Sequence, residues 1–206
     1  MSELIYLTNV RLSFPHIIEP QRTVNAETGK ERIAYSADFL LDKDDPQFGK
    51  FMNLVNRMAQ IEWKEHAAAV MTMINSDRKV RCFGTEVDKI NKKTFLPYDG
   101  YVGKVYITAS RDRPPQMIDE AGQAVPLDNT MQYQQLARKM YGGCRVNVAV
   151  KPWAQKNKHG NGIRSDLVAI QFCKDDVAFG EGDVDASAGF GAVASAPVAM
   201  PSFLGG

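Results

Sequence analysis

Cations and an aromatic ring share one face of a predicted β-hairpin that spans Tyr141 to Lys174. Its first arm alternates between an apolar set (Val146, Val148 and Val150) and a polar or aromatic set (Arg145, Asn147, Lys151 and Trp153). The tip adds lysines at 156 and 158 and no acid, and the second arm, Ile163 to Phe172, is apolar enough for a strand. Because cations bind phosphates and a flat ring stacks on bases, this face suits a single-stranded nucleic acid.

A second predicted strand, Tyr101 to Ser110, repeats the arrangement with Lys104, Tyr106 and Thr108 on one face. An ordinary solvent face of a sheet also explains such a pattern, but two strands of this kind favour a binding groove. The candidate DNA-binding residues are Lys104, Tyr106, Arg111, Arg113, Arg145, Lys151, Trp153, Lys156, Lys158 and Arg164. We expect the cations to neutralise phosphates and the two aromatic rings to stack on bases, although Trp153 also fits a place in the core.

Motifs of the common enzyme classes are absent from the chain. There is no Walker A sequence and no G-x-S-x-G, and Gly100 and Gly103 lack the remaining spacing of a dinucleotide fingerprint. The cysteines, Cys82, Cys144 and Cys173, form no C-x-x-C pair and have no histidine at ligand spacing. We therefore expect no catalytic activity, no cofactor and no metal. A metal-dependent nuclease stays an alternative, because its acids can be remote in sequence.

Charge is divided unevenly along the 206 residues, although the net charge is only +1. Residues 1–174 contain all 25 Lys and Arg and 19 of the 24 acids, which leaves that part with +6 and residues 175–206 with −5. Residues 175–206 are rich in Gly and Ala and show no strand or helix period, so we expect a flexible acidic tail. Such a tail is suited to occupying the cationic groove when DNA is absent.

The remaining pattern predicts a mainly β, α+β domain over residues 1–174 with a helical insertion at about 44–75. Strands are expected at Leu4–Phe14, ended by Pro15, at Ile33–Leu41 and at Arg78–Phe83, besides the three above. Residues 4, 6, 8, 10, 12 and 14 should share one face of the first strand. Asp45 followed by Pro46 is a typical helix start, and a second helix is expected at Met131–Lys139. The chain has no long apolar run, so we expect no membrane span.

Three segments carry a resemblance to a known family: YSADFLLDK, PYDGYVGKVYITASRDRPP, and YGGCRVNVAVKPWAQKNKHGNGIRSDLVAIQF followed by KDDVAFG. They resemble the Enc-type bacteriophage single-stranded DNA-binding proteins over most of residues 4 to 180. The resemblance implies an oligonucleotide/oligosaccharide-binding (OB) fold, a five-stranded, partly open antiparallel barrel. It also implies that the protein coats single-stranded DNA during phage replication, recombination and repair, in the cytoplasm of the infected bacterial host.

Two further expectations depend on this resemblance. A strand-annealing recombination factor would use the same groove, so it stays an alternative to a protein that only binds and protects DNA. The tail resembles the acidic C-termini that dock replication proteins, and phage or host replication proteins are its expected partners. It differs from the bacterial version, because its acids come early and the chain ends Phe203-Leu-Gly-Gly.

Overall fold

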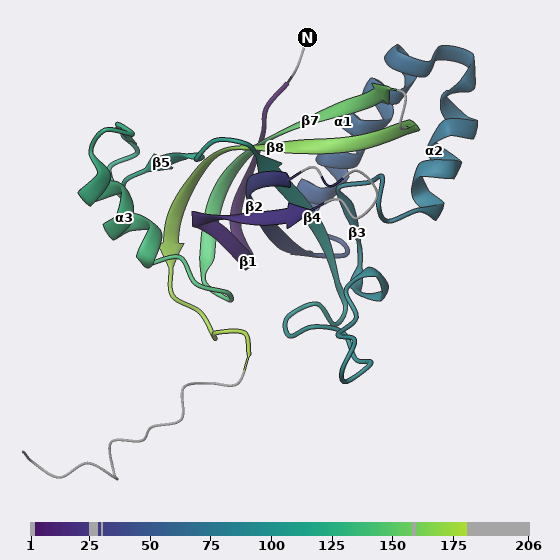
Figure 1. The fold of residues 1–206 in the computed structure, drawn as a ribbon. Helices are drawn as coiled ribbons and strands as arrows, with labels where there is room; N and C mark the ends of the chain where they lie inside the picture. The colour runs from purple at the N-terminus through teal and green to yellow at the C-terminus, as the bar shows by residue number, and fades with distance from the viewer. Residues whose placement is uncertain (1–2, 25–28, 30, 158–159, 181–206) are drawn as a thin grey trace, which may run out of the picture.

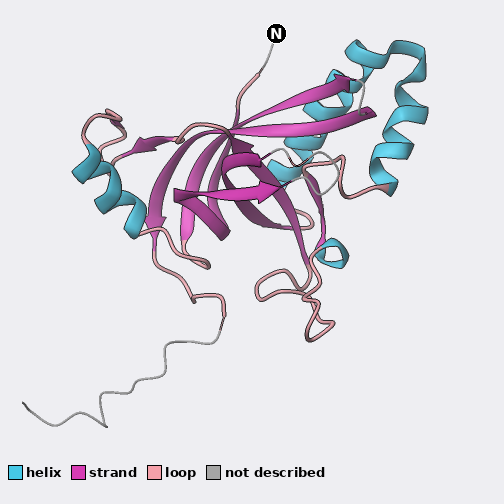
Figure 2. Cartoon of the chain, in the orientation of Figure 1, coloured by secondary structure: helices cyan, strands magenta, loops and turns pink. Residues whose placement is uncertain are grey.

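The computed structural model describes residues 3–24, 29, 31–157 and 160–180. Within these ranges, eight strands form one curved sheet, and helices lie near its two ends (Figures 1 and 2). The strands are β1 (Ile5–Val24), β2 (Glu31–Asp42), β3 (Phe83–Thr85), β4 (Lys104–Arg111), β5 (Gln116–Ile118), β6 (Ala124–Val125), β7 (Arg145–Asn157) and β8 (Gly160–Lys174). The helices are α1 (Pro46–Trp63), α2 (Ala67–Ser76) and α3 (Thr130–Arg138), with short 3-10 turns η1 (Lys64–His66) and η2 (Glu86–Asp88).

The strand order in the sheet is β3-β4-β2-β1-β7-β8-β5-β6. All neighbours are antiparallel except β5 and β8, which are parallel, so the architecture is a mixed α+β fold. The predicted hairpin is confirmed as β7 and β8, whose Trp153 lies opposite Arg164. The sheet has more strands than the five-stranded barrel that the resemblance implies, because the short strands β3, β5 and β6 extend its two edges.

The strands β4 and β8 are bridged by an irregular segment, residues 79–82. The Ile163 N–H donates to the Val80 carbonyl at 2.8 Å, and the Thr108 N–H donates to the Cys82 carbonyl at 2.7 Å. The segment therefore satisfies backbone groups of both strands and curls the sheet toward closure. The strand predicted at Arg78–Phe83 is wrong, since these residues bridge two strands and β3 begins only at the last of them.

The first strand departs from simple alternation at a register shift between Leu7 and Val10. Asn9 has a φ of 56°, a left-handed conformation that moves the following side chains to the other face. Leu7 is therefore fully buried together with Val10, whereas Tyr6 is 69 % exposed. The prediction that Tyr6 and Val10 share a face is wrong for this reason.

The same strand continues through Pro15, where the sequence predicted its end. Register shifts interrupt the pairing with β2 between Ser13 and His16, and again before Gln21. A proline is tolerated at such a bulge because no ladder hydrogen bond is required from its nitrogen. β1 consequently reaches Val24 and forms a long two-stranded arm with β2.

The helical insertion forms as its local signals predict. The Asp45 carboxylate accepts a hydrogen bond from the Gln47 N–H at 2.8 Å, and Pro46 is the first residue of α1. The apolar stripe of α1 packs into the core, with Phe51 and Val55 fully buried. Figure 1 shows α1 and α2 beside the far end of the β7–β8 hairpin, so the insertion supports that hairpin.

We predict that Gly162→Ala destabilises the protein by about 1–3 kcal/mol. A Cβ at position 162 would lie 2.6 Å from the Val80 carbonyl oxygen, a backbone atom, so the bridging segment has to move away from β8. Chemical denaturation with urea measures the change in the free energy of unfolding.

The control is Gly49→Ala in α1, where a Cβ meets nothing within 4 Å. Because glycine is a poor helix former, this variant should gain about 0.5–1 kcal/mol. An unchanged midpoint for Gly162→Ala would contradict the role of the bridging segment.

Candidate nucleic-acid interface

A cleft of about 1170 Å³ opens where β2, β4, β7 and β8 meet the segments 78–82 and 88–98. It is lined by nine basic residues: Arg32, Arg78, Lys79, Arg81, Lys89, Lys92, Arg111, Arg113 and Arg164. Only three acids line it, and two of these, Asp88 and Asp166, hold a hydrogen bond from another lining side chain. The cleft therefore concentrates positive charge that its own acids do not balance, and it is suited to an anionic ligand.

Arg164 on β8 lies at the centre of this charge. Its guanidinium donates to the Gln155 side chain at 3.1 Å and to the Lys79 carbonyl at 2.9 Å, and both partners are uncharged. Burial lowers the pKa of Arg164, and the positive charge of Arg32 lowers it further. Both cations line the cleft, and an anionic group bound near them would offset this effect.

Two polar atoms of the cleft lining are buried without a hydrogen-bond partner in the described part of the chain. They are Nε of Arg81 and Oγ of Ser165. A buried polar atom without a partner costs roughly 1–3 kcal/mol.

Trp153 lies on the cleft side of β7 and not in the core. The residue is 40 % exposed, and its indole Nε1–H donates to the Asp166 carboxylate at 2.9 Å. The hydrogen bond to the neighbouring strand fixes one edge of the ring and leaves part of it accessible from the cleft. The tryptophan of the core is Trp63, which is only 5 % exposed.

Beneath the cleft, the carboxylate of Asp38 is buried with three partners. Asp38 is 3 % exposed and accepts hydrogen bonds from Tyr101 and Thr108, both at 2.5 Å. The Lys89 ammonium forms an ion pair with it at 2.6 Å. Burial is the main cause that raises the pKa of Tyr101, and the negative charge of Asp38 raises it further. The Tyr101 hydroxyl therefore keeps its proton and donates it to Asp38 in a hydrogen bond.

Tyr106 belongs to this buried floor, which is a correction to its predicted stacking role. It is 4 % exposed, and the Lys89 ammonium lies over its ring at 4.6 Å from the centroid. Burial, followed by the charge of Asp88, raises the pKa of its hydroxyl. The sequence pattern predicted that this face of β4 is exposed to solvent. The segment after β3 covers it here, so the Tyr106 ring is not accessible to a base.

The structure brings together half of the sequence-predicted residues. Those that line the cleft are Tyr106, Arg111, Arg113, Trp153 and Arg164, and those that do not are Lys104, Arg145, Lys151 and Lys156. Lys104 forms an ion pair with Asp42, and Lys156 lies 3.8 Å from Glu62 of α1. Lys158 lies outside the described residues.

Six cations of the cleft were missed from sequence: Arg32, Arg78, Lys79, Arg81, Lys89 and Lys92. The available signal was charge density, since two short segments, 78–81 and 89–93, each carry three cations. Nothing in the local pattern shows that these segments fold over β4 and beside β8. The first segment is placed by the bridging hydrogen bonds to both strands, and the second by the ion pair of Lys89 with Asp38.

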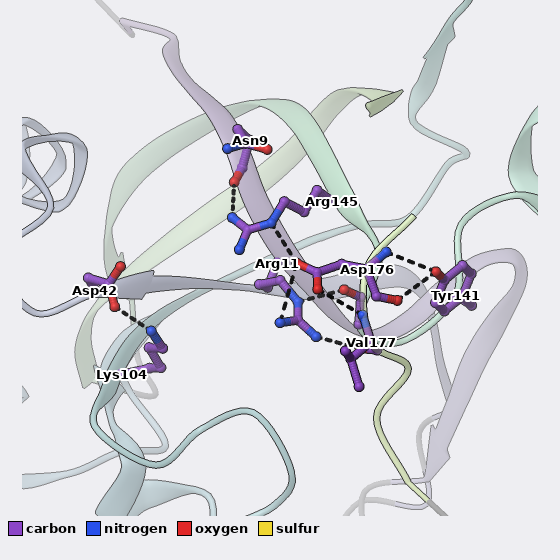
Figure 3. Close-up of polar contacts among 9 residues, drawn as sticks. Asn9, Arg11, Asp42, Lys104, Tyr141, Arg145, Asp176 and Val177 are labelled. Atoms are coloured by element: carbon purple, nitrogen blue, oxygen red, sulfur yellow. Dashed lines mark hydrogen bonds and ion pairs between the residues drawn. The ribbon is translucent and has the colours of Figure 1, made fainter. Parts of the chain in front are cut away.

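Arg145 lies outside the cleft, where it holds the segment Asp175–Gly180, which we call the docked segment (Figure 3). The Asp176 carboxylate pairs with Arg145 at 2.7 Å and with Arg11 at 3.5 Å. The N–H of Val177, together with Arg145, lowers the pKa of Asp176. The Phe179 ring lies 4.6 Å from the Arg11 guanidinium, so the start of the acidic region is attached to β1 and β7.

No group of three or more His, Cys, Asp or Glu in the described ranges is placed to hold a metal ion. None of the helices described above is long and apolar enough to cross a membrane.

Comparisons with known proteins agree on one family. A family model described as Enterobacter phage Enc34, ssDNA-binding protein, matches residues 3–198. A curated relative, putative protein p50 of Acyrthosiphon pisum secondary endosymbiont phage 1, is 28 % identical over 183 residues, covering 87 % of this chain and 88 % of its own.

Solved structures of the single-stranded DNA-binding protein from bacteriophage Enc34 share the fold. The complex with ssDNA has a TM-score of 0.64 at 22 % identity, covering 86 % of this chain and 89 % of that one. A C-terminal truncation has a TM-score of 0.57 at 22 % identity, with coverages of 85 % and 88 %.

We predict that Lys89→Met lowers the free energy of unfolding by roughly 2–4 kcal/mol, because it leaves the buried Asp38 carboxylate without its cation. The loss should be smaller than for a fully buried pair, since the Lys89 side chain is 24 % exposed. Urea denaturation measures it, with Lys92→Met, an exposed lysine of the same segment, as the control.

Adding Asp38→Asn to Lys89→Met should recover part of the loss, because the buried charge is then removed as well. If Lys89→Met and Lys92→Met unfold at the same urea concentration, the ion pair does not support the floor of the cleft.

Proposed function

Because this chain belongs to the family of the Enterobacter phage Enc34 single-stranded DNA-binding protein, we propose that it binds single-stranded DNA in the cationic cleft. The observation that carries the proposal is the cleft itself, where nine cations surround the partly exposed ring of Trp153. Cations that follow the backbone and an aromatic ring that stacks on bases are the two requirements for binding a single strand.

The proposed binding is independent of base sequence. Among the described residues, the cleft is lined by strands and connecting segments, and none of the helices α1, α2 and α3 presents a side chain to it. Its cations are suited to phosphates, which every nucleotide carries, and a ring stacks on any base. Arg164, whose hydrogen-bond partners are both neutral, favours a phosphate oxygen in the cleft.

The proposed fold of this site is an OB barrel made by β1, β2, β4, β7 and β8. The pairings of β1 with both β2 and β7, and of β2 with β4, support it. OB folds commonly bind single strands on their second and third strands, beside the hairpin of the last two. Here these elements are β2, β4 and the β7–β8 hairpin, which all line the cleft.

In the infected bacterial host, we propose that the protein coats and protects single-stranded DNA during phage replication, recombination and repair, without catalytic activity. Residues 1–174 form the DNA-binding domain in this proposal, and residues 175–206 form an acidic tail. The tail would contact phage or host replication proteins when DNA displaces it from the cleft.

The start of the tail supports competition between the tail and DNA. Of its five acids, Asp176 is already held by Arg11 and Arg145 in the docked segment. The segment ends at Gly180, whose N–H donates to the Asp99 carboxylate at 2.9 Å. Asp99 follows Tyr98, a residue of the cleft lining, so the described part of the tail ends beside the cleft wall.

We expect oligo-dT to quench the fluorescence of Trp153 as it binds, with an affinity that falls steeply as salt rises. Trp63 is buried, so it should give a constant background. Arg111→Gln and Arg113→Gln should each reduce the slope of log affinity against log salt by about 0.7, the value for one phosphate contact on a single strand.

The matched control is Lys50→Gln, an exposed cation of α1 outside the cleft lining. The proposal fails if the wild-type protein does not bind oligo-dT, or if Lys50→Gln reduces the salt slope as much as the two cleft variants do.

We also expect deletion of residues 181–206 to raise the affinity for oligo-dT at low salt, because three tethered acids no longer compete for the cations. The full-length variant with Glu181→Gln, Asp183→Asn and Asp185→Asn should behave in the same way, since only charge is changed. Both effects should disappear at high salt, where charges are screened. Equal affinity of all three proteins at low salt would rule out self-competition.

A further inference from the structure

An aromatic side chain lies at the tip of the segment between β3 and β4 without protein packing around it. Phe95 is 79 % exposed, and the adjacent Leu96 is 64 % exposed. Figure 1 shows this segment extending away from the sheet, below the labels of β3 and β4. A large apolar ring that folding leaves in water is a candidate for contact with a ligand.

The tip is held in one conformation by its own hydrogen bonds. The Asn91 N–H donates to the Leu96 carbonyl at 2.9 Å, and the Phe95 N–H donates to the Asn91 carbonyl at 2.8 Å. The Asn91 side chain also accepts from the Lys93 N–H at 2.8 Å. The ring is therefore presented on an ordered turn, which reduces the entropy lost when it stacks on a ligand.

Phe95 has a φ of 57°, in the left-handed region that bulky residues rarely adopt. Glycine or asparagine would take this conformation with less strain. The tip thus combines backbone strain with an exposed aromatic ring, two unfavourable features that stability alone does not explain. Strain of this kind is found at sites that bind ligands.

Both ends of the turn begin in the wall of the cleft. Lys89, Ile90 and Lys92 line the cleft on one side of the tip, and Tyr98 lines it on the other. The Tyr98 N–H donates to the Lys89 carbonyl at 2.9 Å, which fixes the base of the turn to the Asp38 ion pair. The tip is therefore attached to the cleft through Lys89 and Tyr98.

The charged side chains of the turn itself are all positive. Residues 89–98 contain three lysines and no acid, and Lys92 and Lys93 are both exposed. An exposed aromatic ring beside two lysines matches the chemistry of a nucleotide, which has a base and a phosphate. A purely apolar protein partner would gain nothing from these charges.

We propose that Phe95 stacks on a base of single-stranded DNA where the strand leaves the cleft, with Lys92 and Lys93 next to its phosphates. The inference rests on the function proposed above and adds a residue to that site. Phe95 supplies the second stacking ring that the buried Tyr106 cannot supply. The cleft then has an aromatic ring on the β7–β8 hairpin, Trp153, and another on the β3–β4 segment.

The test compares two ligands of equal length: oligo-dT and an oligomer of abasic sites, which keeps the phosphates and lacks the bases. Phe95→Ala should weaken binding of oligo-dT by roughly 5- to 150-fold, the range for one stacked base. Its affinity for the abasic oligomer should equal that of the wild type. Phe95→Asn tolerates the left-handed backbone and should show the same selective loss.

Phe95→Trp should restore the affinity, since a larger ring keeps the stacking. In a Trp153→Phe background its fluorescence should be quenched by oligo-dT and not by the abasic oligomer. Val102→Ala, which removes another exposed apolar side chain of the same segment, should leave both affinities unchanged.

Two results would overturn the inference while leaving the proposed function intact. In the first, the wild type binds oligo-dT and the Phe95 variants bind it equally well, which would assign the tip to a protein contact. In the second, the variants lose affinity for both ligands alike, which would mean that Phe95 maintains the turn. Failure of the wild type to bind oligo-dT would instead reject the proposed function.

Discussion

A buried carboxylate, Asp38, sets the arrangement of the cleft. An unpaired charge in the interior is very unfavourable. The buried position of Asp38 on β2 therefore depends on its three partners, Tyr101, Thr108 and Lys89. Two of these partners come from β4 and the turn before it, and Lys89 comes from the segment after η2. The same pairing that completes the floor therefore fixes the base of the turn that presents Phe95.

The second constraint is the bridging segment, residues 79–82, which follows the helical insertion and lies between β4 and β8. Its backbone contacts both β8 and β4, and it places Lys79 and Arg81 beside Arg164. Bringing these cations together is electrostatically unfavourable in the free protein. Arg81 is stabilised by a bidentate contact with Asp88, while Arg164 has only neutral partners. An anionic strand bound in the cleft would offset this repulsion.

The docked segment links this site to the acidic tail. Phe179 packs against the small cluster of Leu40, Tyr101 and Tyr106, which also forms the floor of the cleft. Gly143 and Gly100 leave room for it, because a Cβ at either position would collide with the segment. The docked segment therefore ends at a defined position, at Gly180 beside Asp99.

Local patterns in the sequence determined the β7–β8 hairpin, the helical insertion with its Asp45 cap, and the separation of a basic domain from an acidic C-terminal region. These follow from residue periods of 2 and 3.6 and from charge counting, which need no knowledge of distant contacts. The added strands, the run of β1 through Pro15 and the burial of Tyr106 depended on bulges and on a covering segment. Only the tertiary structure decided which cations meet, because Lys79, Arg81, Lys89 and Arg164 come from separate segments that backbone hydrogen bonds and one buried ion pair bring to a single cleft.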